Sequence, residues 1–182
     1  MPQRAAAQPS MNTFKVFWSL HKWTGLACTV LIFLTCGTGL MLLLKKQVAW
    51  IQPPTRTGAP GEVSQFLPLS EAFEIALRMD HPDFATVDDI DRVDVRPDAR
   101  VYKLRSKHHH SEVQLCAVTG EVLSIATRRS DLIEELHDGS YFGAWLHDWG
   151  MVAYAVALAF LAFSGWWIWL APKLRKRRRS LD

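Results

Sequence analysis

Histidine is the residue type whose placement in this chain most suggests chemistry. His21 precedes an uncharged apolar stretch by two residues, His147 precedes a second such stretch by three, and His137 lies ten residues before His147. Neutral imidazole is a common ligand of haem iron, and an ionisable residue near membrane depth is costly enough to suggest a function. The alternative is that these histidines are amphipathic residues of a membrane interface, like the tryptophans beside them.

A second group, His108, His109 and His110, is consecutive and falls in a predicted hairpin turn. Such a tract is either a solvated turn or a weak binding site for iron or copper. The three cysteines are too few for a disulfide framework or for a four-cysteine zinc or iron–sulfur site built from one chain. The sequence has no Cys-x-x-Cys-His motif, which excludes covalently attached c-type haem, and it has no GxGxxG or P-loop nucleotide motif.

The elements that must position these histidines are two long apolar segments. Hydrophobic residues make up 49% of the 182 residues, and they are concentrated in segments 23–44 and 150–171, which carry no formal charge. A helix that crosses the hydrocarbon core needs about 20 such residues, so we predict two transmembrane helices. The first is predicted to be retained rather than cleaved as a signal peptide, because its N-terminal flank is long and no small-x-small site follows it.

The distribution of charge predicts the orientation of these spans. Segments 1–22 and 172–182 together carry nine basic residues and one acidic residue, whereas segment 45–148 carries 12 basic and 17 acidic residues. Positive charge is retained on the inside, so both termini are predicted to be cytoplasmic and the loop to lie on the outer side of the membrane. The basic tail 172–182 then fits contact with anionic membrane lipid better than binding of nucleic acid.

This topology places His21 and His147 on opposite faces of the bilayer. A helix of 20 residues is about 30 Å long, so the two cannot ligate one centre and would mark two haem sites along an electron path. His21 is the only histidine on the inner side, so a bis-histidine haem there needs a second copy, which a two-fold homodimer supplies. The outer site would use His137 with His147, or either residue from both chains. The first pairing needs a bend in the chain, which Gly139 and Gly143 permit.

The loop is predicted to contain a small α+β domain. Residues 45–61 form a linker rich in Pro and Gly, and residues 62–128 contain one helix, from Ser70 to about Asp80, followed by three or four antiparallel strands. Residues 130–149 are predicted to be an amphipathic interfacial segment. The predicted fold class is therefore an α-helical membrane protein, with an extracytoplasmic α+β domain inserted between two spans. A homodimer would form a four-helix bundle.

Several segments resemble the PepSY-associated transmembrane family. Residues 20–26, LHKWTGL, resemble the family's "LHRWxGL" opening, and residues 136–143, LHDGSYFG, resemble its "LHxGxxxG" segment. The pairs Thr38-Gly39 and Ser164-Gly165 fit its "TG" and "SG" motifs, and the loop's helix and strands are similar to a PepSY module. The resemblance covers about residues 14–172. His21 and His137 fall in the family's motifs, whereas His147 does so in none and is a candidate by position alone.

The resemblance implies a b-type haem protein of the bacterial inner membrane, with its loop in the periplasm, that reduces ferric iron or a ferric chelate there, because larger relatives include haem-containing inner-membrane siderophore reductases and iron-regulated membrane proteins. His21 would hold an inner haem b, and His137, His147 or both an outer one, giving two haems or more per dimer. Electrons would come from quinol or a membrane reductase, because the predicted cytoplasmic tails are too short to hold a nicotinamide or flavin. Two other hypotheses stay open. The chain is a haem-free anchor whose PepSY module binds or restrains a partner such as a peptidase, or an accessory protein that binds metal through His108–His110.

Overall fold

The computed structural model describes residues 11–179 in two compact units. Thr38–Glu135 forms one unit, called here the sheet domain, and the described residues before and after it form the other, called the membrane unit. The first ten and last three residues of the predicted cytoplasmic segments lie outside the described residues. The two units are described separately below.

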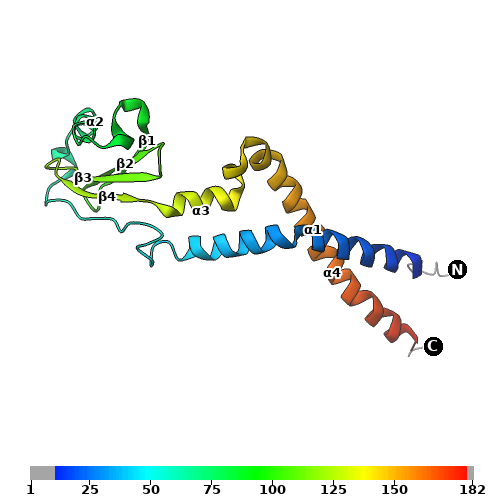
Figure 1. Cartoon of the computed structure of the whole chain (residues 1–182). Helices are drawn as coiled ribbons and strands as arrows, with labels where there is room; N and C mark the ends of the chain where they lie inside the picture. The colour runs from blue at the N-terminus through cyan, green and yellow to red at the C-terminus, as the bar shows by residue number, and fades with distance from the viewer. Residues whose placement is uncertain (1–10, 180–182) are drawn as a thin grey trace, which may run out of the picture. The chain divides into compact units, whose positions relative to one another are not determined.

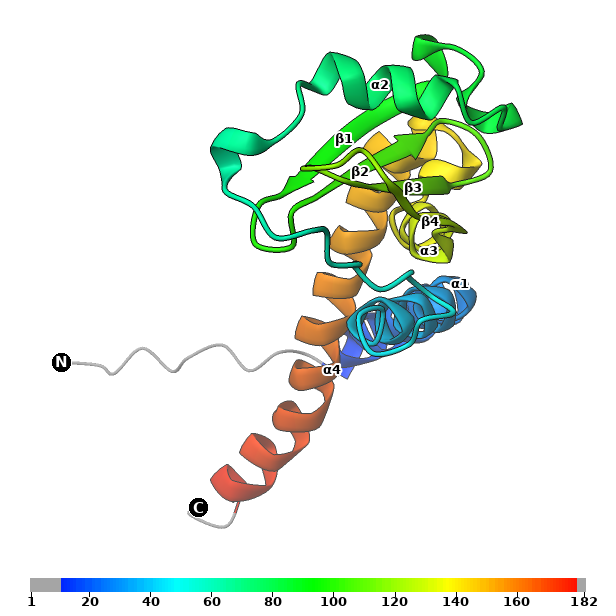
Figure 2. The same ribbon diagram turned by 90° about the vertical axis from the view of Figure 1, so that its left-hand side faces the viewer.

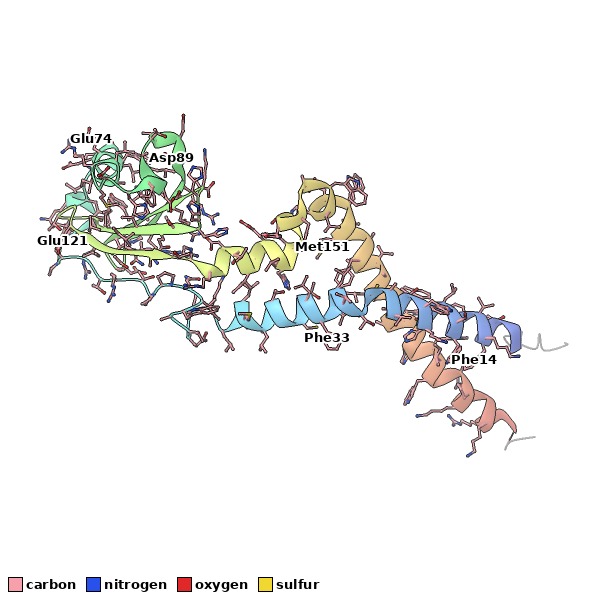
Figure 3. The ribbon with its side chains drawn as sticks, viewed as in Figure 1. Phe14, Phe33, Glu74, Asp89, Glu121 and Met151 are labelled. Carbon is pink, nitrogen blue, oxygen red and sulfur yellow. The ribbon has the colours of Figure 1, made fainter. Side chains whose placement is uncertain are left out.

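Two long helices dominate the membrane unit: α1 (Met11–Leu43), whose last turns reach into the sheet domain, and α4 (Met151–Arg179) (Figure 1). Both are long and apolar enough to cross a membrane, over Thr13–Leu43 and Leu146–Leu174, and only 11% of each apolar window is buried inside the protein. Phe33, for example, projects from α1 with 75% of its surface exposed (Figure 3). Side chains of this kind need an apolar surrounding other than their own chain, as lipid provides.

Both helices extend beyond the segments predicted from charge-free sequence. Helix α1 begins at Met11 rather than near residue 23, and α4 continues through Pro172 to Arg179. A helix of 33 residues is about 50 Å long, which exceeds the hydrocarbon core of about 30 Å. Lys15 and Lys22 therefore belong to a helix that projects from the apolar layer, a continuation that a charge-free window cannot detect.

Helices α1 and α4 run antiparallel where they meet within the membrane unit. The rings of Phe17 and Trp167 lie 6.4 Å apart, and the hydroxyls of Thr35 and Tyr154 lie 2.9 Å apart. As the residue number rises along α1, the contacting residue number falls along α4. This register brings the N-terminal half of α1 next to the C-terminal half of α4.

A bent connection leads into α4. Helix α3 (Arg129–Asp138) ends at Gly139, a 3₁₀ turn covers Ser140–Phe142, and a π-helical turn, Leu146–Gly150, joins directly to α4. Gly139 has φ 77° and Gly143 has φ 110°, conformations that favour glycine. The bend that a shared His137–His147 site would require is therefore present at these two glycines.

In the sheet domain one helix, α2, packs on a four-stranded antiparallel sheet in the order β1-β2-β3-β4, which makes a small α+β fold. Short 3₁₀ turns at Val63–Gln65, Pro82–Phe84 and Val87–Asp89 flank these elements. The elements are α2 (Leu69–Leu77), β1 (Ile90–Arg96), β2 (Val101–Ser106), β3 (Ser111–Cys116) and β4 (Val122–Thr127). The predicted fold class of two apolar helices flanking an α+β domain is confirmed.

Helix α2 covers one face of the sheet and forms the hydrophobic core with it (Figures 1 and 2). The buried core side chains come from α2, the turn after it and the two central strands: Ala72, Ala76, Phe84, Tyr102, Leu104, Val113 and Leu115. The helix is shorter than predicted. It follows Pro68, and Asp80 adopts a left-handed conformation just after it, so the helix ends at Leu77 rather than near residue 80.

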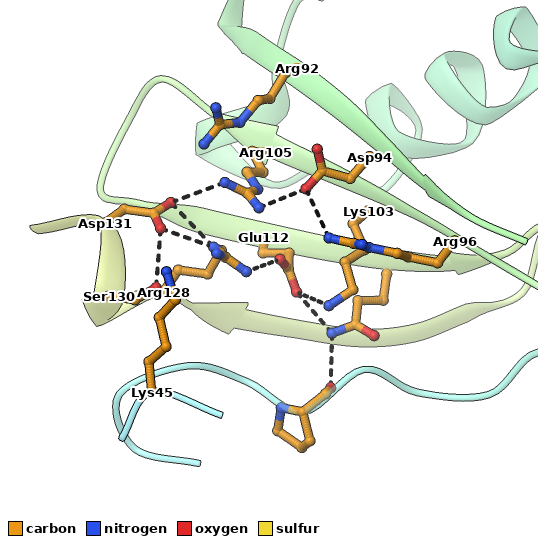
Figure 4. A network of polar contacts seen from close by, with 12 residues as sticks. Lys45, Arg92, Asp94, Arg96, Lys103, Arg105, Glu112, Arg128, Ser130 and Asp131 are labelled. Carbon is orange, nitrogen blue, oxygen red and sulfur yellow. Dashed lines mark hydrogen bonds and ion pairs between the residues drawn. The ribbon is translucent and has the colours of Figure 1, made fainter. Parts of the chain in front are cut away.

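The opposite face of the sheet is polar and is also buried. Lys103, Glu112 and Gln114 each expose 2% or less of their surface, although their alternation with core residues directs them away from α2. The linker covers this face, because the Gln114 amide donates to the Pro54 carbonyl at 3.1 Å and accepts from the Arg56 backbone amide at 2.8 Å. Charged side chains fill the space beneath it (Figure 4).

Candidate functional site

His21 lies at the contact between α1 and α4. Its Nδ1 is 2.8 Å from the hydroxyl of Ser164, a residue of α4 with no exposed surface. The Ser164 hydroxyl donates its own hydrogen to the Phe160 carbonyl one turn earlier, at 2.6 Å. A serine hydroxyl has one hydrogen, so when Ser164 donates it to Phe160 the same oxygen accepts from Nδ1 of His21. In that arrangement Nε2 of the imidazole carries the lone pair.

Two glycines at this crossing leave space for the His21 ring and for close helix packing. A Cβ added to Gly165 would lie 3.3 Å from the Cε1 atom of His21, closer than the ring tolerates without moving. One turn further along α1, a Cβ added to Gly25 would meet Leu161 at 3.6 Å. The Ser164-Gly165 pair therefore does two things for His21: the serine orients the ring and the glycine makes room for it.

His147 lies in the π-helical turn that begins the second apolar helix. Turns of this type are rare and occur frequently at functional sites, because the extra residue redirects side chains. The Nδ1 of His147 is 3.0 Å from the Asp138 carbonyl oxygen, which can only accept, so Nδ1 carries the proton here too. His147, and His21 when Ser164 donates to Phe160, thus have Nε2 available. A histidine that ligates metal commonly donates its other N–H to such an acceptor.

The Asp138 carboxylate supplies negative charge beside His147. Its Oδ1 lies 3.8 Å from His147 Nδ1 and accepts from the Ser140 backbone amide at 2.9 Å and hydroxyl at 2.7 Å. Burial acts to raise the pKa of Asp138, but the two Ser140 donors and the nearby histidines outweigh it, so the pKa lies below its ordinary value. Asp138 is therefore an anion at neutral pH, able to stabilise positive charge nearby.

His137 shares this surrounding. It is half-buried near the end of α3, next in sequence to Asp138, and both His137 and His147 act electrostatically on the Asp138 carboxylate. Met151, at the start of α4 (Figure 3), packs close to Gly139, since a Cβ added to Gly139 would lie 3.2 Å from the Cγ atom of Met151. The bent connection thus brings the two predicted outer histidines to one region.

His21 and His147 lie at opposite ends of the helix pair. Ser164, the partner of His21, is 17 residues along the same helix from His147, which corresponds to about 25 Å at the rise of an α-helix. The two histidines are therefore too far apart to ligate one centre. They flank an apolar segment of roughly the thickness of a bilayer core.

The tract His108–His110 forms the turn between β2 and β3, and its three rings interact with three different carboxylates. His108 lies 3.0 Å from Asp89, His109 lies 2.8 Å from Asp83, and His110 lies 3.8 Å from Glu135. His109 and His110 both have positive φ, a conformation that costs a residue with a side chain on the order of 1–2 kcal/mol.

The carboxylates beside this turn are stabilised as anions. The Ser111 hydroxyl lowers the pKa of Asp83, with a further contribution from His109, and the Thr86 amide lowers that of Asp89, with a further contribution from His108. Among residues 11–179, no three His, Cys, Asp or Glu side chains converge as a set of metal ligands. The turn is therefore an array of separate His–carboxylate pairs.

Two features of the candidate site escaped the sequence. Ser164 was predicted only as a small packing residue within a motif, and its hydrogen bond to a histidine 143 positions away has no local signal. The π-helical turn around His147 has no local sequence signal either, because it depends on how the chain packs after the bend at Gly139 and Gly143.

Comparison with known proteins is consistent with this arrangement. The model of a family described as the PepSY-associated TM region matches residues 18–181. The match includes both apolar helices, the sheet domain between them and the three histidines discussed above. No match to the chain was found among curated proteins or among solved structures.

Proposed function

The chain belongs to the PepSY-associated transmembrane family, and we propose that this membrane protein is a b-type haem protein that carries electrons across the bilayer to ferric iron or a ferric chelate. The observation that carries the proposal is the His21–Ser164 contact, in which a buried hydroxyl placed to accept a hydrogen bond from Nδ1 would leave Nε2 free to ligate iron inside an apolar helix pair. Bound haem would supply a one-electron Fe(III)/Fe(II) couple.

The donor set fits haem better than it fits a small metal ion. Haem iron needs one or two axial imidazoles, and the described residues provide oriented histidines but no cluster of three ligands. His21 would hold the iron of one haem, and His147, with His137 beside it, that of another. Ser164 and the Asp138 carbonyl would fix the ring orientations, and the Asp138 carboxylate would favour the cationic Fe(III) form of the outer group.

A homodimer would complete the inner site. Each chain brings a single His21 to the α1–α4 crossing, and most of the surface of both apolar helices is uncovered. A two-fold partner would bring a second His21 and a second helix pair, forming a four-helix bundle. Haem-binding residues on facing helices of such a bundle are a common arrangement.

The charge pattern supports an orientation with both termini in the cytoplasm and the sheet domain in the periplasm. Electrons would then enter near His21, from quinol or a membrane reductase, and leave near His147. The acceptor would be ferric iron or a ferric chelate in the periplasm, and the protein would act as a ferric reductase.

The test is visible spectroscopy of the purified, detergent-solubilised protein after haem-replete expression, with haem quantified per chain. We expect a Soret band and reduced-minus-oxidised peaks of b-type haem in the wild type. His21→Ala should remove one spectral component and His147→Ala or His137→Ala another, whereas His81→Ala, in the sheet domain, should leave the spectrum unchanged. Absence of a Soret band, or equal haem in all variants, would contradict the proposal.

A second candidate function is that of a haem-free anchor for a partner-binding domain. Strand β4 lies at an edge of the sheet, contains no charged residue or proline, and exposes 49% of Ile125. Unprotected edges of this kind accept an added strand from a partner. Full biological activity in a His21→Ala, His147→Ala double variant, together with loss of activity in Ile125→Lys, would favour this function over electron transfer.

A further inference from the structure

A cavity with a strongly basic lining lies in the sheet domain, on the polar side of the sheet. Its volume is about 370 Å³, within the usual range of ligand pockets of roughly 300–1,000 Å³. The lining comes from the residues just after α1, the linker, the end of β1 and the middle of β2: Lys45, Lys46, Gln52, Pro53, Pro54, Thr55, Arg96 and Lys103. Four of these residues are cationic and none is acidic.

The carboxylates nearest this cavity, Glu112 and Asp94, form their shortest hydrogen bonds with residues that do not line it. The Oε1 of Glu112 accepts from the Gln114 amide at 2.8 Å, while the Nζ of Lys103 stays 3.5 Å from it. The other oxygen, Oε2, accepts from Arg128 at 2.8 Å. Lys103, which is 2% exposed, is therefore the most distant of the three partners of the buried Glu112 carboxylate (Figure 4).

Arg96 and Lys46 also lack a strong carboxylate partner among the described residues. The Oδ2 of Asp94 accepts from Arg105 at 2.6 Å, and Arg96 lies 4.0 Å from the same oxygen. Within the part of the chain that the structure describes, Lys46 forms no ion pair. Only Lys45 has a close carboxylate, Glu134 at 2.5 Å.

The whole cluster carries excess positive charge. It contains six cations, Lys45, Lys46, Arg96, Lys103, Arg105 and Arg128, against four carboxylates, Asp94, Glu112, Asp131 and Glu134. Burial lowers the pKa of Lys103, and Glu112 offsets this only in part. An anion of about two charges in the cavity would balance the cluster.

The cavity lies near the level at which the first apolar helix ends. The apolar segment stops at Leu43, and Lys45 and Lys46 follow two and three residues later, within about 5 Å along a helical rise. Phosphate groups of lipids occupy this level of a membrane, and basic residues next to a span are attracted to them.

We propose that this cavity binds a phosphate-type oxyanion, with Lys46, Arg96 and Lys103 as its cationic groups. The phosphate belongs either to the headgroup of an anionic phospholipid or to a soluble phosphate, since both present the same charged oxygens. The site does not depend on haem, so its test is independent of the proposed electron transfer.

The test compares two double variants of the full chain in a phosphate-free, uncharged detergent. Lys46→Gln with Arg96→Gln removes two lining charges from exposed side chains, and Arg78→Gln with Lys107→Gln removes two exposed charges elsewhere in the domain. Inorganic phosphate is titrated by calorimetry. Phosphatidylglycerol and phosphatidylcholine are titrated separately, and bound lipid is counted by native mass spectrometry.

We expect the Lys46/Arg96 variant to bind one of these anionic probes about 30-fold more weakly than the wild type, from about 1 kcal/mol per basic residue. The control should stay within about twofold. Loss of phosphate binding identifies a soluble anion, and loss of one bound phosphatidylglycerol, with no change for phosphatidylcholine, identifies a lipid headgroup. Equal affinities of both double variants and the wild type for both anionic probes would overturn the proposal, because the two lysines at the end of α1 would then be simple interfacial charges.

Discussion

Replacing Ser164 by alanine tests the role assigned to the contact between the two apolar helices. The substitution removes the hydroxyl that lies 2.8 Å from Nδ1 of His21 and changes little else, because Ser164 is fully buried and Ala is of similar size. A donor left without a partner in a buried site costs about 1–3 kcal/mol. The ring would then rotate or exchange its tautomer, and Nε2 would no longer be held in one direction.

The size of the effect on haem follows from this cost. Loss of the group that orients a metal-bound histidine lowers affinity by about 10–100-fold, which agrees with the range of 1–3 kcal/mol. The assay is haem per chain after haem-replete expression, together with the rate of haem transfer to an excess of a soluble haem acceptor. We expect Ser164→Ala to lose the same spectral component as His21→Ala, but incompletely.

Thr29 provides the matched control. Its hydroxyl donates to the Gly25 carbonyl one turn earlier at 2.7 Å, as Ser164 does to Phe160 within α4, but among the described residues it forms no hydrogen bond to α4. Thr29→Ala should therefore change haem content and transfer rate by less than about twofold. If Ser164→Ala retains wild-type haem content and transfer rate, or if both variants lose haem equally, Ser164 does not orient a haem ligand.

Three further predictions concern the sheet domain. Glu112→Gln should lower the free energy of unfolding by about 3–5 kcal/mol, because two buried cations lose their shared anion. The control Glu74→Gln, in an exposed ion pair, should change it by less than about 1 kcal/mol. Thermal melts followed by circular dichroism compare the two variants, and equal melting temperatures would refute the role of the network. Gly120→Ala should destabilise the domain by about 1–3 kcal/mol in the same assay, because φ at this residue is 75° and the new Cβ would lie 2.6 Å from a side chain of α2. Unchanged stability would show that the turn adapts. Burial raises the pKa of Tyr102 above its ordinary value of 10.0, so the folded state keeps the phenol proton to a higher pH than the unfolded state does. Stability should therefore fall as pH rises above about 10. Tyrosinate absorbance should show one tyrosine that ionises at a higher pH than the others and that Tyr102→Phe removes, and an ordinary titration of all tyrosines would contradict the burial argument.

The regular elements could be predicted because their signals are local. Two charge-free apolar segments indicate spans, and alternating apolar residues such as Val113 and Leu115 indicate strands. The boundaries of the long helices were less well predicted. Lys15, Lys22 and Pro172 mark the edges of an apolar segment, but a helix continues wherever its backbone hydrogen bonds are satisfied.

The candidate histidines were found from their position and their motifs, and their separation followed from helix length. Their surroundings were not predictable. His21 meets Ser164, and His147 meets Asp138 through a bend and a π-helical turn. Each hydrogen bond depends on the register between segments, and the type of a single residue does not encode that register.

The sequence by itself determined the membrane class of this protein, the α+β domain between its two apolar helices and the family to which the chain belongs. Hydrophobic periodicity, charge and short motifs carry that information within a few residues of each position. The tertiary structure alone decided which nitrogen of His21 contacts Ser164, that the polar face of the sheet is buried, and that Lys46, Arg96 and Lys103 share one cavity. These features come from side chains up to 143 positions apart, which meet only when the helices and strands pack.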